Sequence, residues 1–188
     1  DINAITAMAL HEPKLIEIQE EENSIEQIKQ TGYFVADEKR GPLLRHLIKE
    51  NNLHQVLVFV SSAYKADNVA NKLRKNGINA QSLHGKKSQQ TRLNALADFK
   101  SQKLTVLVAT DILARGIDIE SLPTVINYDL PRSPKDYIHR IGRTGRADEN
   151  GEAITFVCEE DKHHFKVIQK KMKKWVDMID SSPIFEHK

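Results

Sequence analysis

Two patterns of hydrophobic and polar positions alternate along most of the chain. Continuous apolar runs at 56–60 and 105–109 are typical of buried strands. Between such runs, apolar residues recur at three- and four-residue steps, which is typical of amphipathic helices. Strands are predicted at 25–35, 56–60, 80–83, 105–109, 125–128 and 153–158, and helices from 41, over 65–76 and 88–100, from 133, and over 161–175. Strands that alternate with helices predict an α/β fold whose mostly parallel central sheet is covered on both faces.

Local signals refine this prediction. Ser88 and Ser133 are expected to begin helices, and Gly77 to end one. Tyr128 is expected to pack at the end of the sheet, beside an Asp129 with a structural role. In the last helix, a stripe at steps of three, four and three residues is predicted to face the core, which leaves the helix lysines to solvent: Phe165, Ile168, Met172 and Trp175.

Length and composition indicate one globular domain without a membrane partner. The 188 residues are 39% hydrophobic, and no apolar run reaches the roughly 20 residues that span a bilayer. The expected organisation is a linker and remnant of a preceding domain at 1–22, the domain at 23–180, and a tail at 181–188. Cys158, the single cysteine, is interpreted as a core residue in a reducing cytoplasm. A net charge of +2 does not decide function.

Three segments that follow strands carry the candidate chemistry, because ligands of parallel α/β folds bind beyond the carboxyl ends of strands. Segment 110–118 combines two acids, an arginine and a glycine, which suits hydroxyls and phosphates, although a helix cap and a turn explain it equally well. Segment 82–92 joins Gly85 to Arg92 in the first turns of a helix, where a phosphate can bind. An ordinary exposed arginine is the favoured alternative for Arg92.

The third segment, 139–146, has the sequence His-Arg-Ile-Gly-Arg-Thr-Gly-Arg. Its arginines are three residues apart, so they lie near one another if the segment is helical. Each glycine in a helix costs roughly 1 kcal/mol relative to alanine, and a merely solvated basic helix would not need them. Arginines separated by glycines therefore indicate a site where phosphate oxygens approach the backbone.

Four segments resemble, in order, the conserved motifs of the second lobe of DEAD-box RNA helicases. They are 58–62, Gln89-x-x-Arg92, 109–118 and 139–146. The resemblance runs from about residue 25 to 175, and the last two segments are its most specific part. A histidine at position 139 resembles the DEAD-box group, because related helicases usually carry Gln there. The sequence as a whole is similar to a bacterial, RhlE-like branch. The implied fold is RecA-like, with three α/β/α layers.

The resemblance also implies roles for individual residues. Arg143 and Arg146 would be arginine fingers on the γ-phosphate of an ATP held by the other lobe, and Asp118 would accept a ribose hydroxyl. Residues implied to couple the two lobes are Arg115, His139 and Arg140. Residues implied to contact the RNA backbone are Ser61, Ser62, Gly85, Arg92 and Thr110. The implied function is RNA-stimulated ATP hydrolysis that drives local unwinding of RNA.

The sequence departs from a whole helicase in one respect. It contains neither a Gly-x-x-x-x-Gly-Lys-Ser/Thr phosphate loop nor an Asp-Glu-Ala-Asp box. ATP with Mg²⁺ is therefore expected to bind mainly to the N-terminal RecA-like lobe of the same polypeptide, and this chain alone is expected not to hydrolyse ATP. No metal ligands are predicted within it, and His163-His164 beside two glutamates is interpreted as a surface feature.

Two other functions fit parts of the sequence. A DNA helicase or translocase lobe is disfavoured by His139 and Asp118, and stimulation by single-stranded DNA would support it. A stand-alone RNA- or protein-binding module is disfavoured by residues 1–22, which are interpreted as the end of a preceding domain.

Overall fold

The computed structural model describes residues 28–111, 119, 121–145 and 151–186. Within these ranges, seven strands form one sheet in the order β3-β4-β2-β5-β6-β1-β7, and every pairing is parallel. The strands are β1 (Lys29–Phe34), β2 (Val56–Phe59), β3 (Ala80–Leu83), β4 (Val106–Ala109), β5 (Thr124–Asn127), β6 (Glu152–Val157) and β7 (Asp177–Asp180). The predicted α/β class is confirmed, and the sheet is parallel throughout rather than mostly parallel.

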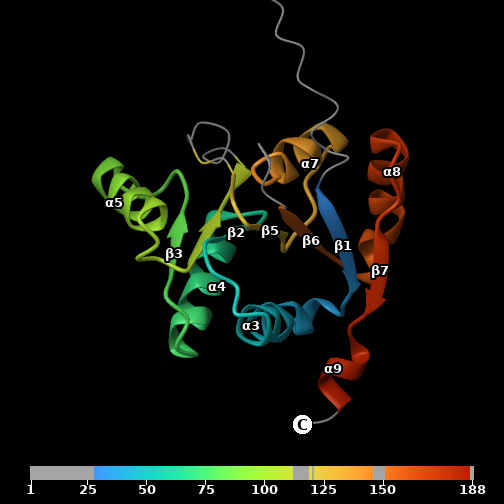
Figure 1. Ribbon diagram of the computed structural model, residues 1–188, viewed down its shortest axis with the longest axis horizontal. Coiled ribbons are helices and arrows are strands. Elements are labelled where there is room, and N and C mark those ends of the chain that lie inside the picture. The colour runs from blue at the N-terminus through green and yellow to red at the C-terminus, as the bar shows by residue number, and fades with distance from the viewer. Residues whose placement is uncertain (1–27, 112–118, 120, 146–150, 187–188) are drawn as a thin grey trace, which may run out of the picture.

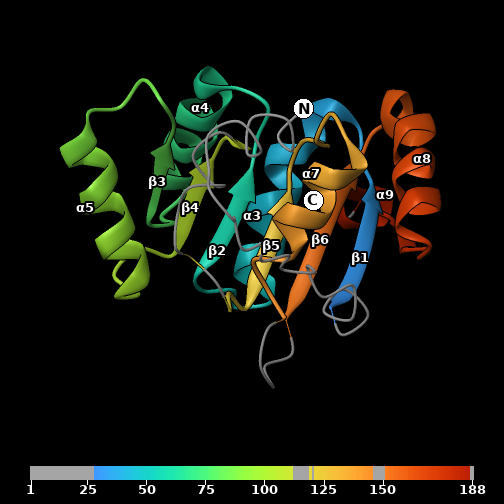
Figure 2. The ribbon, with the colours of Figure 1, turned by 90° about the horizontal axis from the view of Figure 1, so that it is seen from above.

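Helices cover both faces of this sheet and form three layers (Figure 1). One face carries α3 (Arg40–Glu50) and α4 (Ala63–Lys75), and the other carries α5 (Gln89–Lys100), α7 (Pro134–Ile141) and α8 (Lys162–Met172). Alternation within β2 shows why both faces need a cover: Val56 and Val58 pack with α3 and α4, whereas Leu57 and Phe59 pack with α5. Figure 2 shows the strands running side by side between these layers.

The helix starts predicted at Ser88 and Ser133 are confirmed, and the structure adds a third serine cap, Ser62. Ser62, Ser88 and Ser133 each accept a hydrogen bond from the backbone N–H three residues on, at the first turns of α4, α5 and α7. Gly77 follows α4 with a φ of 77°, a conformation that glycine adopts without strain. Tyr128 is 9% exposed and packs against Phe156 with ring centroids 5.8 Å apart, as expected.

The last helix is shorter than predicted. It ends at Met172, and Lys173 adopts a left-handed conformation with a φ of 56°. Phe165 and Ile168 are buried as expected and Met172 is partly buried, but the prediction for Trp175 is wrong because 64% of that residue is exposed. The physical reason is that the chain has already left the helix, so the helical spacing no longer determines where its side chain points.

Two further elements were not predicted. Strand β7 pairs with β1 at the edge of the sheet, and the short α9 (Ser182–Glu186) follows it. Within the tail predicted at 181–188, α9 places Ile184 and Phe185 against the core that holds α3 and α4. The linker predicted at 1–22 lies outside the described residues.

Within the described part of the chain, no helix combines the length and the apolar character that crossing a bilayer requires.

Candidate nucleic-acid interface

The carboxyl ends of three neighbouring strands bring the sequence-predicted residues together. Phe59 of β2 and Leu83 of β3 both lie opposite Ala109 of β4. The residues that follow continue this alignment, because the Val60 N–H donates to the Ala109 carbonyl over 3.0 Å and the Thr110 N–H to the Leu83 carbonyl over 3.3 Å. Three segments therefore begin side by side at the carboxyl ends of these strands, and they carry Ser61 and Ser62, Gly85, and Thr110.

Exposure at this edge fits a surface that meets a ligand. Ser61, Ser62 and Gly85 are exposed, and Thr110 and Arg92 are partly exposed. A Cβ atom added to Gly85 would meet no atom within 4 Å, so the space above its backbone is open. Arg92 donates to Gln89 through one terminal nitrogen, whereas its buried Nε has no hydrogen-bond partner among the described residues. The edge thus combines hydroxyls, open backbone and a guanidinium group.

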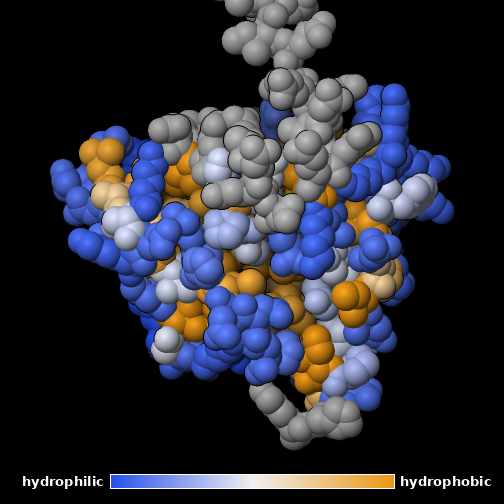
Figure 3. Space-filling model, viewed as in Figure 1, coloured by the Kyte–Doolittle hydropathy of each residue, from blue (hydrophilic) through white to orange (hydrophobic). Residues whose placement is uncertain are grey.

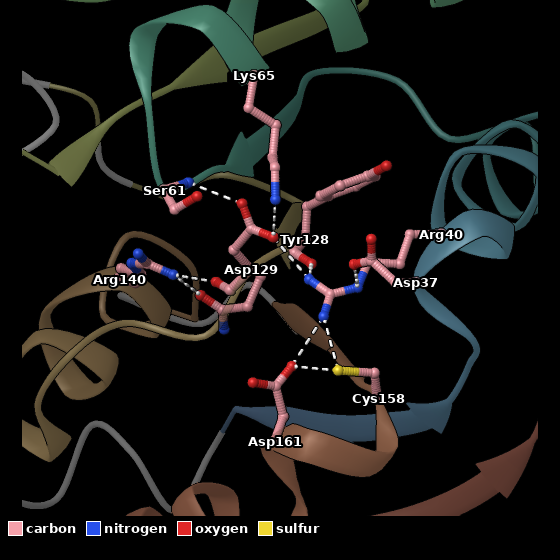
Figure 4. A network of polar contacts seen from close by, with 10 residues as sticks. Asp37, Arg40, Ser61, Lys65, Tyr128, Asp129, Arg140, Cys158 and Asp161 are labelled. Carbon is pink, nitrogen blue, oxygen red and sulfur yellow. Dashed lines mark hydrogen bonds and ion pairs between the residues drawn. The ribbon is translucent and has the colours of Figure 1, made fainter.

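A buried carboxylate holds the β2–α4 turn in place. Asp129, which follows β5, is 5% exposed. Its Oδ2 accepts the Ser61 N–H over 2.8 Å, and its Oδ1 lies 2.6 Å from Arg40 Nη1 and 3.0 Å from Lys65 Nζ (Figure 4). Because the Ser62 side chain caps α4, both hydroxyl-bearing residues of this turn are fixed by hydrogen bonds.

Arg40 extends the same network across the fold. It is 5% exposed and donates to the Tyr128 carbonyl, to Asp161 and to the Sγ of Cys158, at 2.9, 2.8 and 3.0 Å. We call Asp129, Arg40, Lys65, Asp161 and the Ser61 backbone the Asp129 hub. Burial alone lowers the pKa of Arg40, but its partners Cys158, Asp129 and Asp161 outweigh burial and raise the pKa above its usual value. Cys158 is buried as predicted, with polar partners rather than purely apolar ones.

A second acidic residue holds the β3–α5 turn. Asp67 of α4 accepts hydrogen bonds from Ser82 Oγ at 2.5 Å and Lys87 Nζ at 2.9 Å, and its Oδ2 lies 3.1 Å from His84 Nε2. Partial burial raises the pKa of the Asp67 carboxyl, yet these three partners outweigh burial and hold the pKa well below its ordinary value of 3.8. The turn that exposes Gly85 is therefore tied to the neighbouring helix from both sides.

The arginines of segment 139–146 do not share one environment. Helix α7 ends at Ile141, so the condition for a helical cluster is not met. Arg140 is 2% exposed and grips Asp111 with two hydrogen bonds of 2.6 and 2.8 Å. It also donates to Asn127 and to the Asp129 carbonyl, and its guanidinium lies 4.9 Å from the centre of the Phe59 ring. All three guanidinium nitrogens of Arg140 thus have partners within this lobe.

Arg143 lies beyond the helix, near the amino-terminal end of β5 and thus opposite the carboxyl ends of the strands that precede Ser61, Gly85 and Thr110. Its carbonyl accepts the Leu122 N–H over 3.0 Å, and Leu122 comes just before β5 begins. Arg143 is partly exposed there, and His139 is partly exposed on α7. Arg146, Arg115 and Asp118 lie outside the described residues. The segment therefore separates a buried arginine from one that borders solvent.

Gly145 of this segment is closely approached by other residues of the protein itself. Gly145 has a φ of 71°, and an added Cβ would lie 2.7 Å from Ile28 Cγ1. A Cβ on Gly151 would lie 2.0 Å from Thr144 Oγ1 and 2.2 Å from the Gly145 nitrogen. Close packing of two chain segments therefore accounts for Gly145, where the sequence had suggested a phosphate.

Sequence reasoning missed Asp67 and the hub partners of Asp129. Asp129 offered a signal, because it follows β5 as Thr110 follows β4, and it was assigned only a structural role. Asp67 gave no signal, since its partners lie 15 to 20 positions away in the chain. Within the described ranges, no group of three or more His, Cys, Asp and Glu side chains is arranged to hold a metal ion.

Comparison with known proteins identifies relatives over most of the chain. Residues 38–148 match the family of helicase conserved C-terminal domains. The chain is 40% identical over 157 residues to the ATP-dependent RNA helicase RhlB of Pseudomonas putida, and 35% identical over 189 residues to the probable ATP-dependent RNA helicase ddx49 of Dictyostelium discoideum. These alignments cover 84% and 100% of this chain but only 39% and 37% of the relatives. The chain thus spans less than half of their length, and an RhlE-like branch stays a prediction.

Solved structures of the DEAD-box protein Dbp5 share the fold. Its C-terminal domain matches with a TM-score of 0.78 at 32% identity, covering 84% of this chain and 92% of that chain. Dbp5 of Saccharomyces cerevisiae bound to RNA and ADP BeF3 matches with a TM-score of 0.82 at 29% identity, covering 98% of this chain and 50% of that chain. The RecA-like architecture is therefore confirmed.

Proposed function

The chain belongs to the helicase conserved C-terminal domain family, within the DEAD-box group, and on that premise we propose that it works as one lobe of an ATP-dependent RNA helicase. In this role it contacts the RNA backbone and completes the ATP site of an N-terminal lobe. Closure of the two lobes on RNA and ATP parts a short stretch of duplex. The observation that carries the proposal is the convergence of exposed hydroxyls, open backbone and Arg92 at one sheet edge.

The RNA side of the proposal rests on the three strand ends. Ser61, Ser62 and Thr110 supply hydroxyls, Gly85 leaves its backbone accessible, and Arg92 supplies a positive charge one turn into α5. Such groups suit phosphate and ribose oxygens and carry little base information, so binding depends on salt and only weakly on sequence. The Asp129 hub and Asp67 act as positioning groups for these turns. The RNA-bound form of Dbp5 supports this assignment by its similarity alone.

The ATP side rests on Arg143 and on residues outside the described ranges. Arg143 and Arg146 would reach the γ-phosphate of an ATP bound with Mg²⁺ by the other lobe, with Asp118 on the ribose. Arginine fingers of this kind accelerate nucleotide hydrolysis by about 10³ to 10⁵. The chain itself contains no Gly-x-x-x-x-Gly-Lys-Ser/Thr phosphate loop, so the proposal assigns binding of the triphosphate and Mg²⁺ to the other lobe.

The coupling residues take two different parts in this proposal. His139, partly exposed on α7, and Arg115 would face the other lobe. Arg140 would act indirectly, because its contacts hold Asp111, the residue at which segment 111–118 begins. A loss of Arg140 would then disturb Arg115 and Asp118 together, although the guanidinium nitrogens of Arg140 bind groups of this lobe.

The test joins this chain to the N-terminal lobe of its own polypeptide. ATP hydrolysis is measured with single-stranded RNA, with single-stranded DNA and with neither. We expect stimulation by RNA, and a fall of about 10³-fold or more in kcat for Arg143→Ala or Arg146→Ala. Arg45→Ala on α3, at the other face of the sheet, is the matched control and should leave kcat unchanged.

Three results would overturn the proposal. They are stimulation by DNA in preference to RNA, full activity of both arginine variants, and turnover of ATP by the 188-residue chain alone. The first would favour a DNA translocase lobe, and the third would require an ATP site within this lobe.

A further inference from the structure

Helix α8 and the turn that follows it carry an unbalanced positive charge. Residues 162–176 include six lysines and no acid, although the whole chain has 28 basic and 26 acidic residues. The remaining 22 basic residues are therefore outnumbered by acids elsewhere. Hydrophilic side chains predominate at the upper right of the space-filling view, where α8 lies, and apolar side chains appear below them (Figure 3). A net charge of +2 thus conceals a local concentration of cations.

Two of the six lysines have structural partners. Lys162 pairs with Glu159 at 2.5 Å and lies over the Phe34 ring, and Lys174 donates to the Ile28 carbonyl over 3.2 Å. The other four are exposed and have no acidic partner among the described residues: Lys166, Lys170, Lys171 and Lys173. Like charges this close repel one another, so their arrangement costs stability unless counter-charge comes from outside the lobe.

Trp175 stands at the end of this charged face. It is the only tryptophan of the chain, and 64% of it is exposed. Its neighbours are fixed on both sides: Lys174 is bound to Ile28, and the buried Val176 donates its N–H to Gln169 Oε1 over 2.8 Å. An indole held outward on an anchored turn offers a flat apolar surface at little cost in conformational entropy.

We propose that the α8 basic face, defined as Lys166, Lys170, Lys171, Lys173 and Trp175, binds single-stranded nucleic acid. One base stacks on the Trp175 indole, and the lysines hold the flanking phosphates. Aromatic stacking combined with cations that follow the backbone is how proteins bind single strands without sequence preference. Charge complementarity favours a polyanion over a second protein surface, and an exposed indole among lysines favours one with bases.

This site is separate from the RNA-contacting edge of the proposed function. Trp175 comes just before β7, and β7 and β1 begin side by side, so Trp175 lies at the amino-terminal edge of the sheet. Ser61, Gly85 and Thr110 lie at the carboxyl edge, beside strands at the other end of the strand order. An RNA that binds both places must pass around the lobe, which makes the α8 basic face an accessory anchor for a strand outside the cleft.

The single tryptophan allows a direct test with the 188-residue chain. Trp175 fluorescence is titrated with a single-stranded oligouridylate of about 12 nucleotides. We expect saturable quenching, because a stacked base contacts the indole. An abasic oligomer of equal length and charge should bind more weakly and quench little. Trp175→Ala should weaken binding, followed by anisotropy of labelled RNA at low salt, by about 5- to 150-fold, the range for one base–aromatic stack.

Charge variants test the lysines independently of the indole. Lys170→Gln, Lys171→Gln and Lys173→Gln together should reduce the slope of log K against log salt by about 2, at roughly 0.7 per phosphate contact. The matched control replaces three exposed lysines elsewhere, Lys72, Lys75 and Lys103, and should change the slope little. Asp177→Asn, which removes the exposed acid beside Trp175, should tighten binding.

Other outcomes distinguish a failure of this proposal from a failure of the proposed function. RNA binding without a change in Trp175 fluorescence, and with full affinity in Trp175→Ala, would place all RNA at the carboxyl edge and leave the proposed function intact. Quenching by the separate N-terminal lobe but not by RNA would make this face a protein interface. Quenching by RNA in a chain that shows no RNA-stimulated ATP hydrolysis when joined to its other lobe would retain this site and reject the proposed function.

Discussion

Two sets of cationic side chains in this lobe have opposite surroundings. Arg40 and Arg140 are at most 5% exposed, and each has carboxylate and carbonyl partners within 3.0 Å. The lysines of the α8 basic face are exposed and have no acidic partner among the described residues. A buried charge must be neutralised by the fold itself, whereas an exposed one can take its counter-ion from a ligand. Residue type alone does not distinguish the two.

Arg140→Ala should have the largest effect on stability. It leaves the Asp111 carboxylate without its bidentate partner and removes a donor from Asn127 and the Asp129 carbonyl. Removing one member of such a buried pair costs about 3–5 kcal/mol, and the lower end applies because Asp111 is 32% exposed. Urea unfolding of the 188-residue chain measures this loss. A loss below about 0.5 kcal/mol, equal to that of the Arg45→Ala control, would contradict the comparison.

Asp129→Asn should have the next largest effect. Asparagine keeps the shape of the side chain but loses the negative charge that pairs with both Arg40 and Lys65. The free energy of unfolding should therefore fall by about 2 kcal/mol. The urea midpoint should fall with an unchanged m-value, since the native surface is retained. Asp98→Asn on α5, a partly exposed acid, serves as the control. A variant as stable as the wild type would mean that the Asp129 hub is not held by charge.

Asp67→Asn tests a charged group that is neither buried like Arg140 nor fully exposed like the α8 lysines, because Asp67 is 40% exposed. Its pKa is lowered in the folded protein, so its contribution to stability is complete above the ordinary value of 3.8 and is lost as pH falls further. The stability gap between wild type and Asp67→Asn should therefore be largest near neutral pH and should shrink between about pH 5 and pH 2. A gap that is independent of pH would contradict a charged role.

The same variant separates positioning from simple electrostatics in RNA binding. Neutralising an acid beside an RNA-contacting turn should strengthen binding if only long-range charge matters. If Asp67 orders the turn that exposes Gly85, the loss of its contacts with Ser82, His84 and Lys87 should weaken RNA binding. We expect weakening in an anisotropy titration with labelled single-stranded RNA. Tighter binding by Asp67→Asn would show that order in this turn is not limiting.

The lysines of the α8 basic face should have the smallest effect on stability. Replacing Lys170, Lys171 and Lys173 by glutamine should change the free energy of unfolding by no more than about 0.5 kcal/mol, because exposed charges without partners contribute little. Relief of repulsion should make any change stabilising at low salt. A loss of more than about 1 kcal/mol in urea unfolding would mean that these lysines support the fold, like Arg140.

Short-range patterns in the sequence were sufficient for most elements. Ser88 and Ser133 were predicted to begin helices because a cap needs only the residue three positions on, and Gly77 was predicted to end one for an equally local reason. The continuous apolar runs predicted β2 and β4, since a strand between two helix layers must be apolar on both sides. Strand ends also predicted that Ser61, Gly85 and Thr110 converge, because parallel strands place their carboxyl ends at one edge, whereas Arg143 of the third segment lies near the amino-terminal end of β5.

The errors share a different cause. Trp175 continues the spacing of Phe165, Ile168 and Met172, but the left-handed Lys173 ends α8 first, and the next residues pair with β1. The sequence Asp-Met-Ile-Asp of β7 has little strand pattern, because an edge strand that is mostly exposed needs little apolar surface. Pairing with β1 therefore decided this end of the chain.

The order of strands and helices up to α8, their caps and the positions of the candidate residues along the chain were determined by the sequence itself, since each depends on neighbours a few residues away. Only the tertiary structure decided that Arg140 is buried against Asp111 while Arg143 borders solvent, and that Trp175 is exposed near lysines that have no acidic partner among the described residues. The physical reason is that burial and charge pairing depend on residues tens of positions apart, which meet only when the sheet and its helices assemble.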